Sequence, residues 1–585
     1  MYTEVKSYQF IISLLKQYGI KHCVLSAGSR NVPFVHSVEE DSDFKCYSVV
    51  DERSAGYFAL GLAQELNEPV VISCTSSTAT CNYWPAVAEA YYQNVPLIVL
   101  TSDRDQRMVG QWEDQLIDQV GMYDRHEKKS VNLPIINDKN DEIYCQRLIN
   151  EALLELDHNG AKGPIHINIP TNTYNRSFII KNLPVAHKID RLFLNNLNVW
   201  NDRIEKLKKC SKILVVCGQQ SHVSEKLLKE IDVFFEKYNC VIVGDYMSNI
   251  KFKEIINTTV SMDSNVVSQN YFNKLMPDLV ISFGGQIFSG IKEQLKKNNG
   301  KFEHWIFQED GKVVDAFKSL TTIFECKPED AFEVLNNKTN GENSKEYFKL
   351  FKEYNDSIRI PDFKYSSVYA IKNVVENLPD DSVLHLSIND SIRITNFFKI
   401  PDTTKVYANI GTHGIDGCMS SFFGQSVASN KQSFLVIGDL AFFYDMNSLR
   451  INAIDNNVHI LLINNHGGSE FYYNKIQQNN DKHTTARHNN IAEGWVKDND
   501  FLYLAAHNKE EFDNNLGKFL NNGSKKPVLL EVFTEMKDDA EVIHEFYNKV
   551  KPTDIKSEFV RKSKDFVKKN IGQEKAKKIL NLFNK

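Results

Sequence analysis

Short runs of apolar residues recur along the chain with helix-like segments between them, which is the pattern of alternating strands and helices. A first set of four runs lies near the N-terminus, and a second set with similar spacing lies more than 350 residues later. The two sets begin at Val24, Val70, Leu97 and Ile165, and at Val383, Phe434, Ile460 and Val528. The corresponding offsets are 359, 364, 363 and 363 residues. Such near-equal offsets predict two copies of one domain.

Strands joined by helices predict parallel sheets with both faces covered. A further group of strand-like runs, at 213–217, 241–244 and 279–283, lies between the two copies. We therefore predict an α/β protein of three domains with parallel sheets, the first and third being structural repeats. The polar stretches 182–201 and 336–345 are expected to be linkers. The predicted boundaries are 1–185, 190–345 and 355–550, followed by a basic helical extension at 551–585.

Composition matches an ordinary globular protein, with 42% hydrophobic and 25% charged residues in a chain of 585. No apolar run approaches the roughly 20 residues of a membrane-spanning helix, so no membrane insertion is expected. The first 16 residues predict an amphipathic helix rather than a secretory signal, which favours a cytoplasmic protein.

The net charge of -6 conceals a basic end, since residues 551–585 hold 11 Lys and Arg against 4 Asp and Glu. Such a tail either attracts nucleic acid or anionic lipid, or forms helices that dock on the body. Its interspersed apolar residues favour docking, and no nucleic-acid partner is expected.

Polar residues follow two strands of the second copy where ligands of parallel sheets bind. Gly438-Asp439-Leu440 follows the strand at 434–437, and Asn464 to Gly468 follow the strand at 460–463. Carboxylate, amide and carbonyl oxygens are the ligands that Mg²⁺ prefers, so we predict metal binding by Asp439, Asn465 and Gly467. Backbone N–H groups near Gly438, Leu440 and Gly468 are candidates for phosphate binding. The alternative is an Asp N-cap with a glycine turn.

Several motifs together resemble those of thiamine-diphosphate enzymes, and most closely the 2-succinyl-5-enolpyruvyl-6-hydroxy-3-cyclohexene-1-carboxylate synthase family of menaquinone biosynthesis. The resemblance covers about residues 10–545. The motifs are Asp51–Gly61 (DERSAGYFALG), Asn82–Val87 (NYWPAV), Val95–Thr101 (VPLIVLT), Ile117–Val120 (IDQV), Gly414–Gly417 (GIDG) and Asn464–Gly468 (NNHGG). The resemblance implies thiamine diphosphate and Mg²⁺ as cofactors, and a transferase that decarboxylates a 2-oxo acid and forms a carbon–carbon bond.

The resemblance also implies roles for individual residues. Glu52 would contact the aminopyrimidine of the cofactor from a buried position, although an acid in a first helical turn is more often exposed. Ser76 and Thr78 are expected near the cofactor, and Ile415 is expected to be the apolar wedge beneath it, or else a core residue. The superfamily completes each site from two subunits, which implies a homodimer or homotetramer.

Substrate residues are partly retained. The family acts on 2-oxoglutarate and isochorismate, and Arg30, Gln115, Asn389 and Arg393 are candidates for contacting them. His413 is a candidate acid or base, the alternative being a structural histidine. Asn389 stands where the family usually has a serine, and His413 where it usually has a small residue. Five further positions depart from the pattern, mostly by loss of positive charge: Val109, Asp114, Gly290, Ile291 and Ile410.

These departures make the expected acceptor pocket less basic. We therefore expect a 2-oxo acid donor and a carbonyl or enoyl acceptor other than isochorismate. Two alternatives remain: the menaquinone synthase itself, with residues such as Lys292 replacing the lost charges, or a catalytically silent, regulatory cofactor-binding protein.

Overall fold

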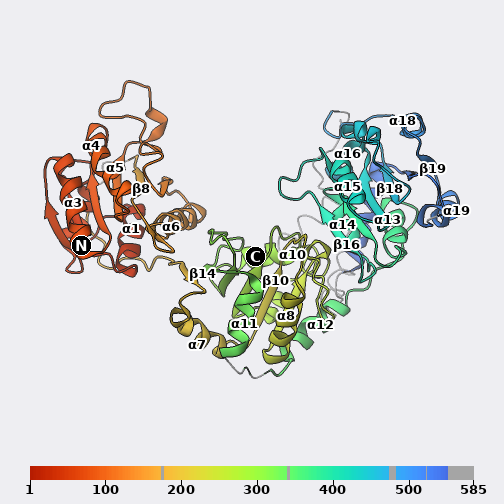
Figure 1. Cartoon of the computed structure of the whole chain (residues 1–585), viewed down its shortest axis with the longest axis horizontal. Helices are drawn as coiled ribbons and strands as arrows, with labels where there is room; N and C mark the ends of the chain where they lie inside the picture. The colour runs from red at the N-terminus through yellow and green to blue at the C-terminus, as the bar shows by residue number, and fades with distance from the viewer. Residues whose placement is uncertain (173–176, 339–340, 342, 474–482, 522, 551–585) are drawn as a thin grey trace, which may run out of the picture. The chain divides into compact units, whose positions relative to one another are not determined.

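The computed structural model describes residues 1–172, 177–338, 341, 343–473, 483–521 and 523–550 (Figure 1). It contains three six-stranded sheets and a small two-stranded one, β6 (Asp157–His158) with β7 (Ala161–Lys162). The chain divides into two compact units, Met1–Asn201 with His304–Cys326, and Asp202–Glu303 with Lys327–Lys585. The predicted basic extension at 551–585 lies outside the described residues.

The first sheet is parallel and carries helices on both faces. Its strands are β1 (His22–Leu25), β2 (Lys45–Ser48), β3 (Val70–Cys74), β4 (Leu97–Asp103), β5 (Lys129–Asn132) and β8 (Ile165–Pro170). Its helices are α1 (Lys6–Gln17), α2 (Val32–Glu39), α3 (Glu52–Leu66), α4 (Thr78–Asn82), α5 (Trp84–Tyr92) and α6 (Lys139–Leu153), with a 3-10 turn η1 (Gln106–Met108). The strand order is β2-β1-β3-β4-β8-β5. One apolar core lies under α1, α2 and α6, and the other under α3 and α5.

The third sheet repeats this plan in the second unit. Its strands are β15 (Val383–Leu386), β16 (Lys405–Ala408), β17 (Ser433–Gly438), β18 (Val458–Asn464), β19 (Leu502–Ala506) and β20 (Val528–Phe533). The helices around it are α13 (Ser367–Val375), α14 (Asp390–Thr395), α15 (Cys418–Val427), α16 (Asp439–Tyr444), α17 (Glu470–Tyr473), α18 (Glu493–Asp498), α19 (Lys509–Leu520) and α20 (Met536–Lys549), with η4 (Met446–Arg450). The order β16-β15-β17-β18-β20-β19 is that of the first sheet, strand for strand.

The shared order confirms the predicted α/β fold and its internal repeat. All eight predicted runs are strands, and each begins within two residues of its expected start. Buried side chains explain this agreement, because every residue of β3, β4 and β8 is buried and such strands must be apolar on both faces.

The middle sheet has the order β11-β10-β12-β13-β14-β9. Its strands are β9 (Asp190–Phe193), β10 (Ile213–Cys217), β11 (Cys240–Gly244), β12 (Leu279–Phe283), β13 (Glu303–Phe307) and β14 (Leu320–Glu325). The neighbouring helices are α7 (Asn201–Lys209), α8 (Glu225–Lys237), α9 (Gln269–Leu275), α10 (Gly290–Lys297), α11 (Pro328–Lys338) and α12 (Glu346–Asp356), with η2 (Leu197–Trp200) and η3 (Tyr246–Ser248). Because β9 lies within 182–201, that stretch is not the simple linker we expected.

Within the described residues, no helix has an apolar stretch long enough to cross a membrane.

Candidate functional site

Asp439 is the first residue of α16 and lies directly beyond β17. Its side chain is buried, with only 2% of the residue exposed. The Gly467 N–H donates to its Oδ2 at 3.0 Å, and the Nε2 atom of His488 lies 3.3 Å from the same oxygen. The structure thus brings together the two strand ends that the sequence predicts to meet.

The turn after β18 requires glycine at its centre. Gly467 has φ of 148°, and a Cβ there would lie 2.7 Å from the Thr485 carbonyl oxygen. The Gly468 N–H donates to that same oxygen at 2.8 Å. A side chain at Gly467 would therefore displace the segment that contains Thr485 and, three residues later, His488.

Asn465 provides an amide at this turn and is 7% exposed. Its Nδ2 donates to Asp539 Oδ2 at 3.2 Å, which leaves its oxygen for another partner. A carboxylate, an amide oxygen and a backbone carbonyl are hard oxygen donors, and this donor set fits Mg²⁺ bound to a diphosphate. Among the described residues no group of three or more His, Cys, Asp and Glu forms an alternative metal centre.

The backbone N–H groups predicted to bind phosphate are not equally free to do so. The Leu440 N–H is bonded to Asp439 Oδ1 at 2.6 Å, so it is occupied within the chain. A Cβ at Gly438 would meet no atom within 4 Å, which leaves open space beside that residue. Gly438 therefore fits a close approach of a ligand better than Leu440 does.

The first unit holds the remaining cofactor candidates. Glu52 is the first residue of α3, whose N-cap Asp51 accepts a hydrogen bond from the Ser54 N–H at 2.9 Å. The Glu52 side chain is partly exposed in the single chain, whereas we expected it to be buried. Thr78 begins α4 and is exposed, while Ser76 is buried at the end of β3.

Two substrate candidates also lie in the first unit. Ser76 Oγ donates to the carbonyl oxygen of Gln115 at 3.0 Å, and Gln115 has φ of 52° within an exposed loop. Arg30 is partly buried beside Tyr8, whose hydroxyl lies 3.4 Å from the Arg30 carbonyl oxygen. The structure therefore joins Ser76 with Gln115 but leaves Glu52 without a described hydrogen bond to either.

A cavity of about 450 Å³ in the second unit contains one of the four substrate candidates and the candidate acid or base. Arg393 and His413 line it, with Lys292, Phe288 and Tyr547. The acidic residues Asp263 and Glu293 line it as well. Burial lowers the pKa of Lys292.

Arg393 is held in place by two neighbours. Its guanidinium lies 3.1 Å from Asp390 Oδ1 and its Cζ atom 4.9 Å from the centroid of the Tyr473 ring. Ser469 Oγ donates to the other oxygen of Asp390 at 2.9 Å. Because Ser469 follows Gly468 directly, Asp390 connects the predicted metal turn to the cavity.

Asn389, His413 and Ile415 each lie in a loop with unusual backbone or packing. Asn389 has φ of 57° and accepts the Arg393 N–H through its carbonyl at 2.9 Å. His413 has φ of 59°, and its ring stacks on Phe288 at a centroid distance of 6.0 Å. Ile415 is partly buried against an apolar cluster beneath the third sheet, which is compatible with a core role as well as with the predicted wedge.

The departures from the family pattern lie in different environments. Val109 and Asp114 are exposed. A Cβ at Gly290 would lie 2.6 Å from the Met262 backbone, and Ile291 is 1% exposed in the core. Ile410 is 2% exposed. Neither Gly290 nor Ile291 is therefore a place for a cationic side chain, whereas the neighbouring Lys292 lines the cavity.

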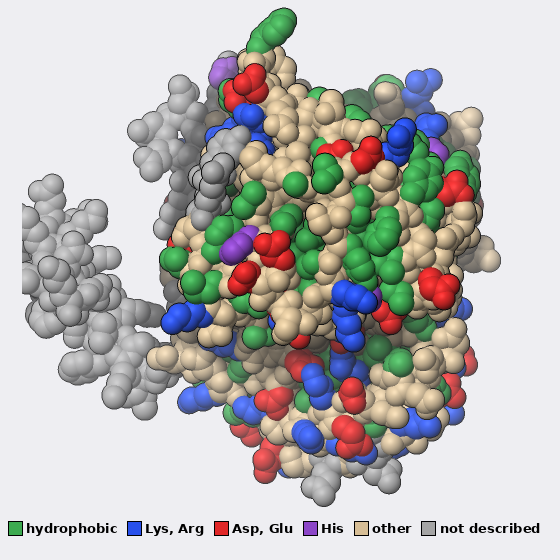
Figure 2. All heavy atoms as spheres, turned by 90° about the vertical axis from the view of Figure 1, so that its left-hand side faces the viewer, with side chains coloured by type: hydrophobic (Ala, Val, Ile, Leu, Met, Phe, Trp, Pro, Cys, Tyr) green, Lys and Arg blue, Asp and Glu red, His purple; other side chains and the backbone are tan. Residues whose placement is uncertain are grey.

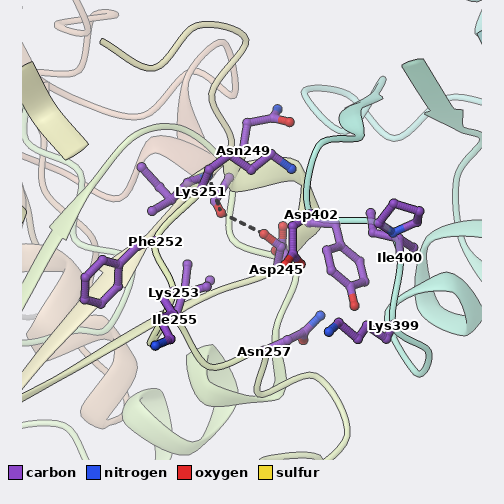
Figure 3. A pocket seen from close by; sticks show the side chains of 15 residues that line it. Asp245, Asn249, Lys251, Phe252, Lys253, Ile255, Asn257, Lys399, Ile400 and Asp402 are labelled. Carbon is purple, nitrogen blue, oxygen red and sulfur yellow. Dashed lines mark hydrogen bonds between the residues drawn. The ribbon is translucent and has the colours of Figure 1, made fainter. Parts of the chain in front are cut away.

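A second cavity, of about 470 Å³, lies beyond β11 and contains none of the predicted residues (Figure 3). Figure 3 shows lysines from two segments around it, Lys251 and Lys253 on one side and Lys399 on the other. Lys251 Nζ donates to the Thr404 carbonyl at 2.6 Å, and Asp245 accepts the Phe288 N–H at 3.0 Å. These bonds hold the loop after β11 in place, and Asp245 also fixes Phe288 at the substrate cavity.

Sequence reasoning missed His488, Asp539 and Asp390. None belongs to the motif at 464–468, and each reaches that turn or its neighbour Ser469 through tertiary packing. The one available signal is position, since Asp390 begins the helix α14 in the polar segment that follows the buried strand β15. It does not apply to the other two.

Comparisons with known proteins identify relatives of nearly the whole chain. Residues 5–122 match the family model "Thiamine pyrophosphate enzyme, N-terminal TPP binding domain". A 2-succinyl-5-enolpyruvyl-6-hydroxy-3-cyclohexene-1-carboxylate synthase of Bacteroides thetaiotaomicron is 37% identical, over 94% of this chain and 100% of the relative. Synthases of the same name from Phocaeicola vulgatus and Christiangramia forsetii are 35% and 31% identical over 94% of this chain, covering 99% and 100% of their own lengths. The chain thus belongs to the 2-succinyl-5-enolpyruvyl-6-hydroxy-3-cyclohexene-1-carboxylate synthase family of thiamine-diphosphate-dependent enzymes.

Proposed function

We propose that this chain is itself such a synthase, coupling the decarboxylation of 2-oxoglutarate to carbon–carbon bond formation with isochorismate. The observation that carries the proposal is the 37% identity to a synthase across that relative's whole length. The expectation of a different acceptor is not supported by these relatives. That expectation rested on five positions, of which Ile291 and Ile410 are buried while Val109 and Asp114 are exposed. The neighbouring Lys292 supplies a positive charge to the cavity.

The substrate cavity supports dicarboxylate recognition. Arg393 presents a planar cation already oriented by Asp390 and Tyr473, so little further ordering is needed to bind a carboxylate. Lys292 adds a second cation at the same cavity. Phe288 and Ile410 supply apolar surface beside them, which strengthens charge pairing by excluding water.

In this proposal each polar residue of the cofactor site has a defined role. Thiamine diphosphate, when bound, supplies the carbon nucleophile and electron sink that 2-oxo acid decarboxylation needs. Asp439, the Asn465 amide oxygen and the Gly467 carbonyl would hold Mg²⁺. Glu52 would exchange a proton with the pyrimidine nitrogen N1′, and His413 would serve as an acid or base near the acceptor.

A homodimer or homotetramer belongs to the same proposal. In this superfamily the domain of Glu52 and the diphosphate domain of another subunit complete one site. Apolar side chains are exposed on α3 and just before it, near Glu52 in the sequence. Val50, Tyr57 and Phe58 are 78%, 44% and 45% exposed. Figure 2 shows hydrophobic side chains gathered on one face of the molecule. A patch of this kind favours an interface.

Light scattering after gel filtration tests the assembly. We expect a mass of at least twice 67.2 kDa for the unmodified chain. Phe58→Asp should shift the protein toward monomer, while Lys297→Asp, on the exposed side of α10, should leave the mass unchanged. A monomeric unmodified protein would contradict this part of the proposal.

The activity is tested with purified protein, thiamine diphosphate and Mg²⁺. We expect CO₂ release from 2-oxoglutarate and, with isochorismate, a coupled product identified by mass spectrometry, at kcat/KM of about 10⁴ M⁻¹s⁻¹ or more. CO₂ release without coupling would indicate another acceptor. No CO₂ from any 2-oxo acid, despite cofactor binding, would indicate a silent protein.

A further inference from the structure

Asp539, in α20, is a buried carboxylate directly beside the proposed metal ligand Asn465. It is 0% exposed and accepts three hydrogen bonds. The Ser367 N–H donates to Oδ1 at 2.8 Å, while Thr534 Oγ1 and Asn465 Nδ2 donate to Oδ2 at 2.7 and 3.2 Å. Every partner of Asp539 is thus a donor, as an ionised carboxylate requires.

The bond from Asn465 determines which way its amide points. Because a carboxylate only accepts, the nitrogen of Asn465 must face Asp539 and the oxygen must face away. No residue in the described part of the chain donates to that oxygen, so it is left for a ligand. We propose that Asp539 is a positioning residue that keeps the Asn465 amide oxygen directed at the magnesium ion. This inference rests on the metal site of the proposed function.

A purely structural role is the competing explanation, since Asp539 also joins the start of α13 to the end of β20. Asp539→Asn separates the two explanations. The Ser367 N–H belongs to the backbone and always donates, so the oxygen of the new amide must face it. Its NH₂ then faces Asn465, whose amide must turn over and present nitrogen to the metal.

A second substitution, at Asn465, restores an oxygen facing the metal without restoring the carboxylate at 539. In Asp539→Asn with Asn465→Asp, the carboxylate at 465 accepts from the new NH₂ and still presents an oxygen to Mg²⁺. A structural role gives no reason for such rescue. Thr534→Val is the matched control, because it removes the other donor to the same oxygen of Asp539 and leaves the amide orientation unchanged.

The experiment is a calorimetric titration of the full chain with Mg²⁺ at saturating thiamine diphosphate, with metal-free melting temperatures measured in parallel. Removing an outer partner of a metal ligand typically weakens affinity about 10–100-fold, and we expect that loss for Asp539→Asn. The double variant should return to within a few-fold of the unmodified protein, and Thr534→Val should stay close to it.

Two outcomes would overturn the inference. One is an Asp539→Asn variant that binds Mg²⁺ as tightly as the unmodified chain. The other is a loss of affinity in Asp539→Asn that the double variant does not recover. If Asp539→Asn fails to fold, the double variant decides alone: folded with near-normal affinity supports the inference, while folded with weak affinity refutes it. Absence of Mg²⁺ binding in the unmodified chain would instead refute the proposed function.

Discussion

The first and third sheets share one strand order and even one polar contact at their carboxyl edge. In the first sheet, Asn168 of β8 donates through Nδ2 to Asp103, the last residue of β4, at 2.8 Å. In the third, Asn464, the last residue of β18, donates through Nδ2 to Glu531 of β20 at 2.7 Å. The amide and the acid have exchanged strands. Both sheets therefore have an amide–carboxylate hydrogen bond between these two strands, with the residue types interchanged. We infer that the bond stabilises the fold, because it pairs buried polar groups at neighbouring strand ends.

The two copies differ in the residues just beyond their strands. After β3 the first copy has the buried hydroxyls Thr75 and Ser76, whereas after β17 the third has the buried carboxylate Asp439. The acid of the first copy, Glu52, lies after β2 and is partly exposed. In the proposed function, the acid of the third copy would bind the metal and the acid of the first copy would serve the site of a partner subunit, although both copies use the same scaffold.

The strongest test of this division is Glu52→Gln. The amide keeps the size of the side chain but cannot exchange a proton with the cofactor, so hydrogen–deuterium exchange at the cofactor's C2 should slow by about 10²–10⁴-fold. Cofactor affinity should change little. Glu65→Gln, an exposed acid on the same helix, is the control. Near-normal exchange in Glu52→Gln would show that the first copy does not provide the activating acid.

Asp439→Ala tests the acid of the third copy. It should weaken Mg²⁺ binding by about 10²-fold or more, because a direct ligand contributes at least as much as its outer partners. The rise in melting temperature with Mg²⁺ and thiamine diphosphate should disappear, while the apo-protein stays folded. Asp498→Ala, on an exposed helix of the same unit, should retain the shift. A full shift in Asp439→Ala would place the metal elsewhere.

Lys292→Met tests whether the cavity of the second unit is the carboxylate site. Loss of a charge-assisted hydrogen bond costs about 1.5–3 kcal/mol, so kcat/KM for the dicarboxylate should fall about 10–100-fold, chiefly through KM. Lys297→Met, an exposed lysine of the same helix, provides the comparison. An unchanged KM would mean that Lys292 does not replace the charges missing at Gly290 and Ile291.

Central strands were predictable from sequence because burial on both faces demands apolar runs. The edge strands β2 and β19 were missed for the opposite reason. None of the four residues of β2 is fully buried, and β19 has only one buried residue, so neither forms an apolar run. Sequence pattern therefore recovers the middle of each sheet better than its borders.

The candidate site divides in a similar way. Asp439 and Asn465 could be predicted because each follows a buried strand, where parallel sheets bind ligands. Asp539 and His488 could not, since only tertiary packing places them at the metal turn. Lys292 was named from the sequence as a replacement for the missing charges. Its place at the cavity could not be predicted, because only the helix orientation decides which of three successive side chains enters the cavity.

The smallest expected effect is a pH dependence of stability in the first copy. It follows from a comparison of two buried acids, Glu531 in the third copy and Glu127 in the first. Glu531 receives hydrogen bonds from Asn464, Ala492 and Tyr503. In the first copy, Oε2 of Glu127 is buried and accepts no hydrogen bond from the described residues. Burial raises the pKa of Glu127 to about 7. Its neighbour His166, 3.8 Å away, has a pKa lowered to about 3 by burial and stays neutral.

The sign of the pH dependence follows from this raised pKa. Between about pH 4.5 and 7 the folded first unit holds a proton on Glu127 that the unfolded chain releases, so its stability falls as pH rises through 7. Hydrogen exchange of the β5 and β8 amides, corrected for intrinsic exchange rates, should show protection decreasing over this range. Glu127→Gln stays neutral and should remove this component, with Glu151→Gln as the control. The same pH slope in Glu127→Gln would assign the effect to another group.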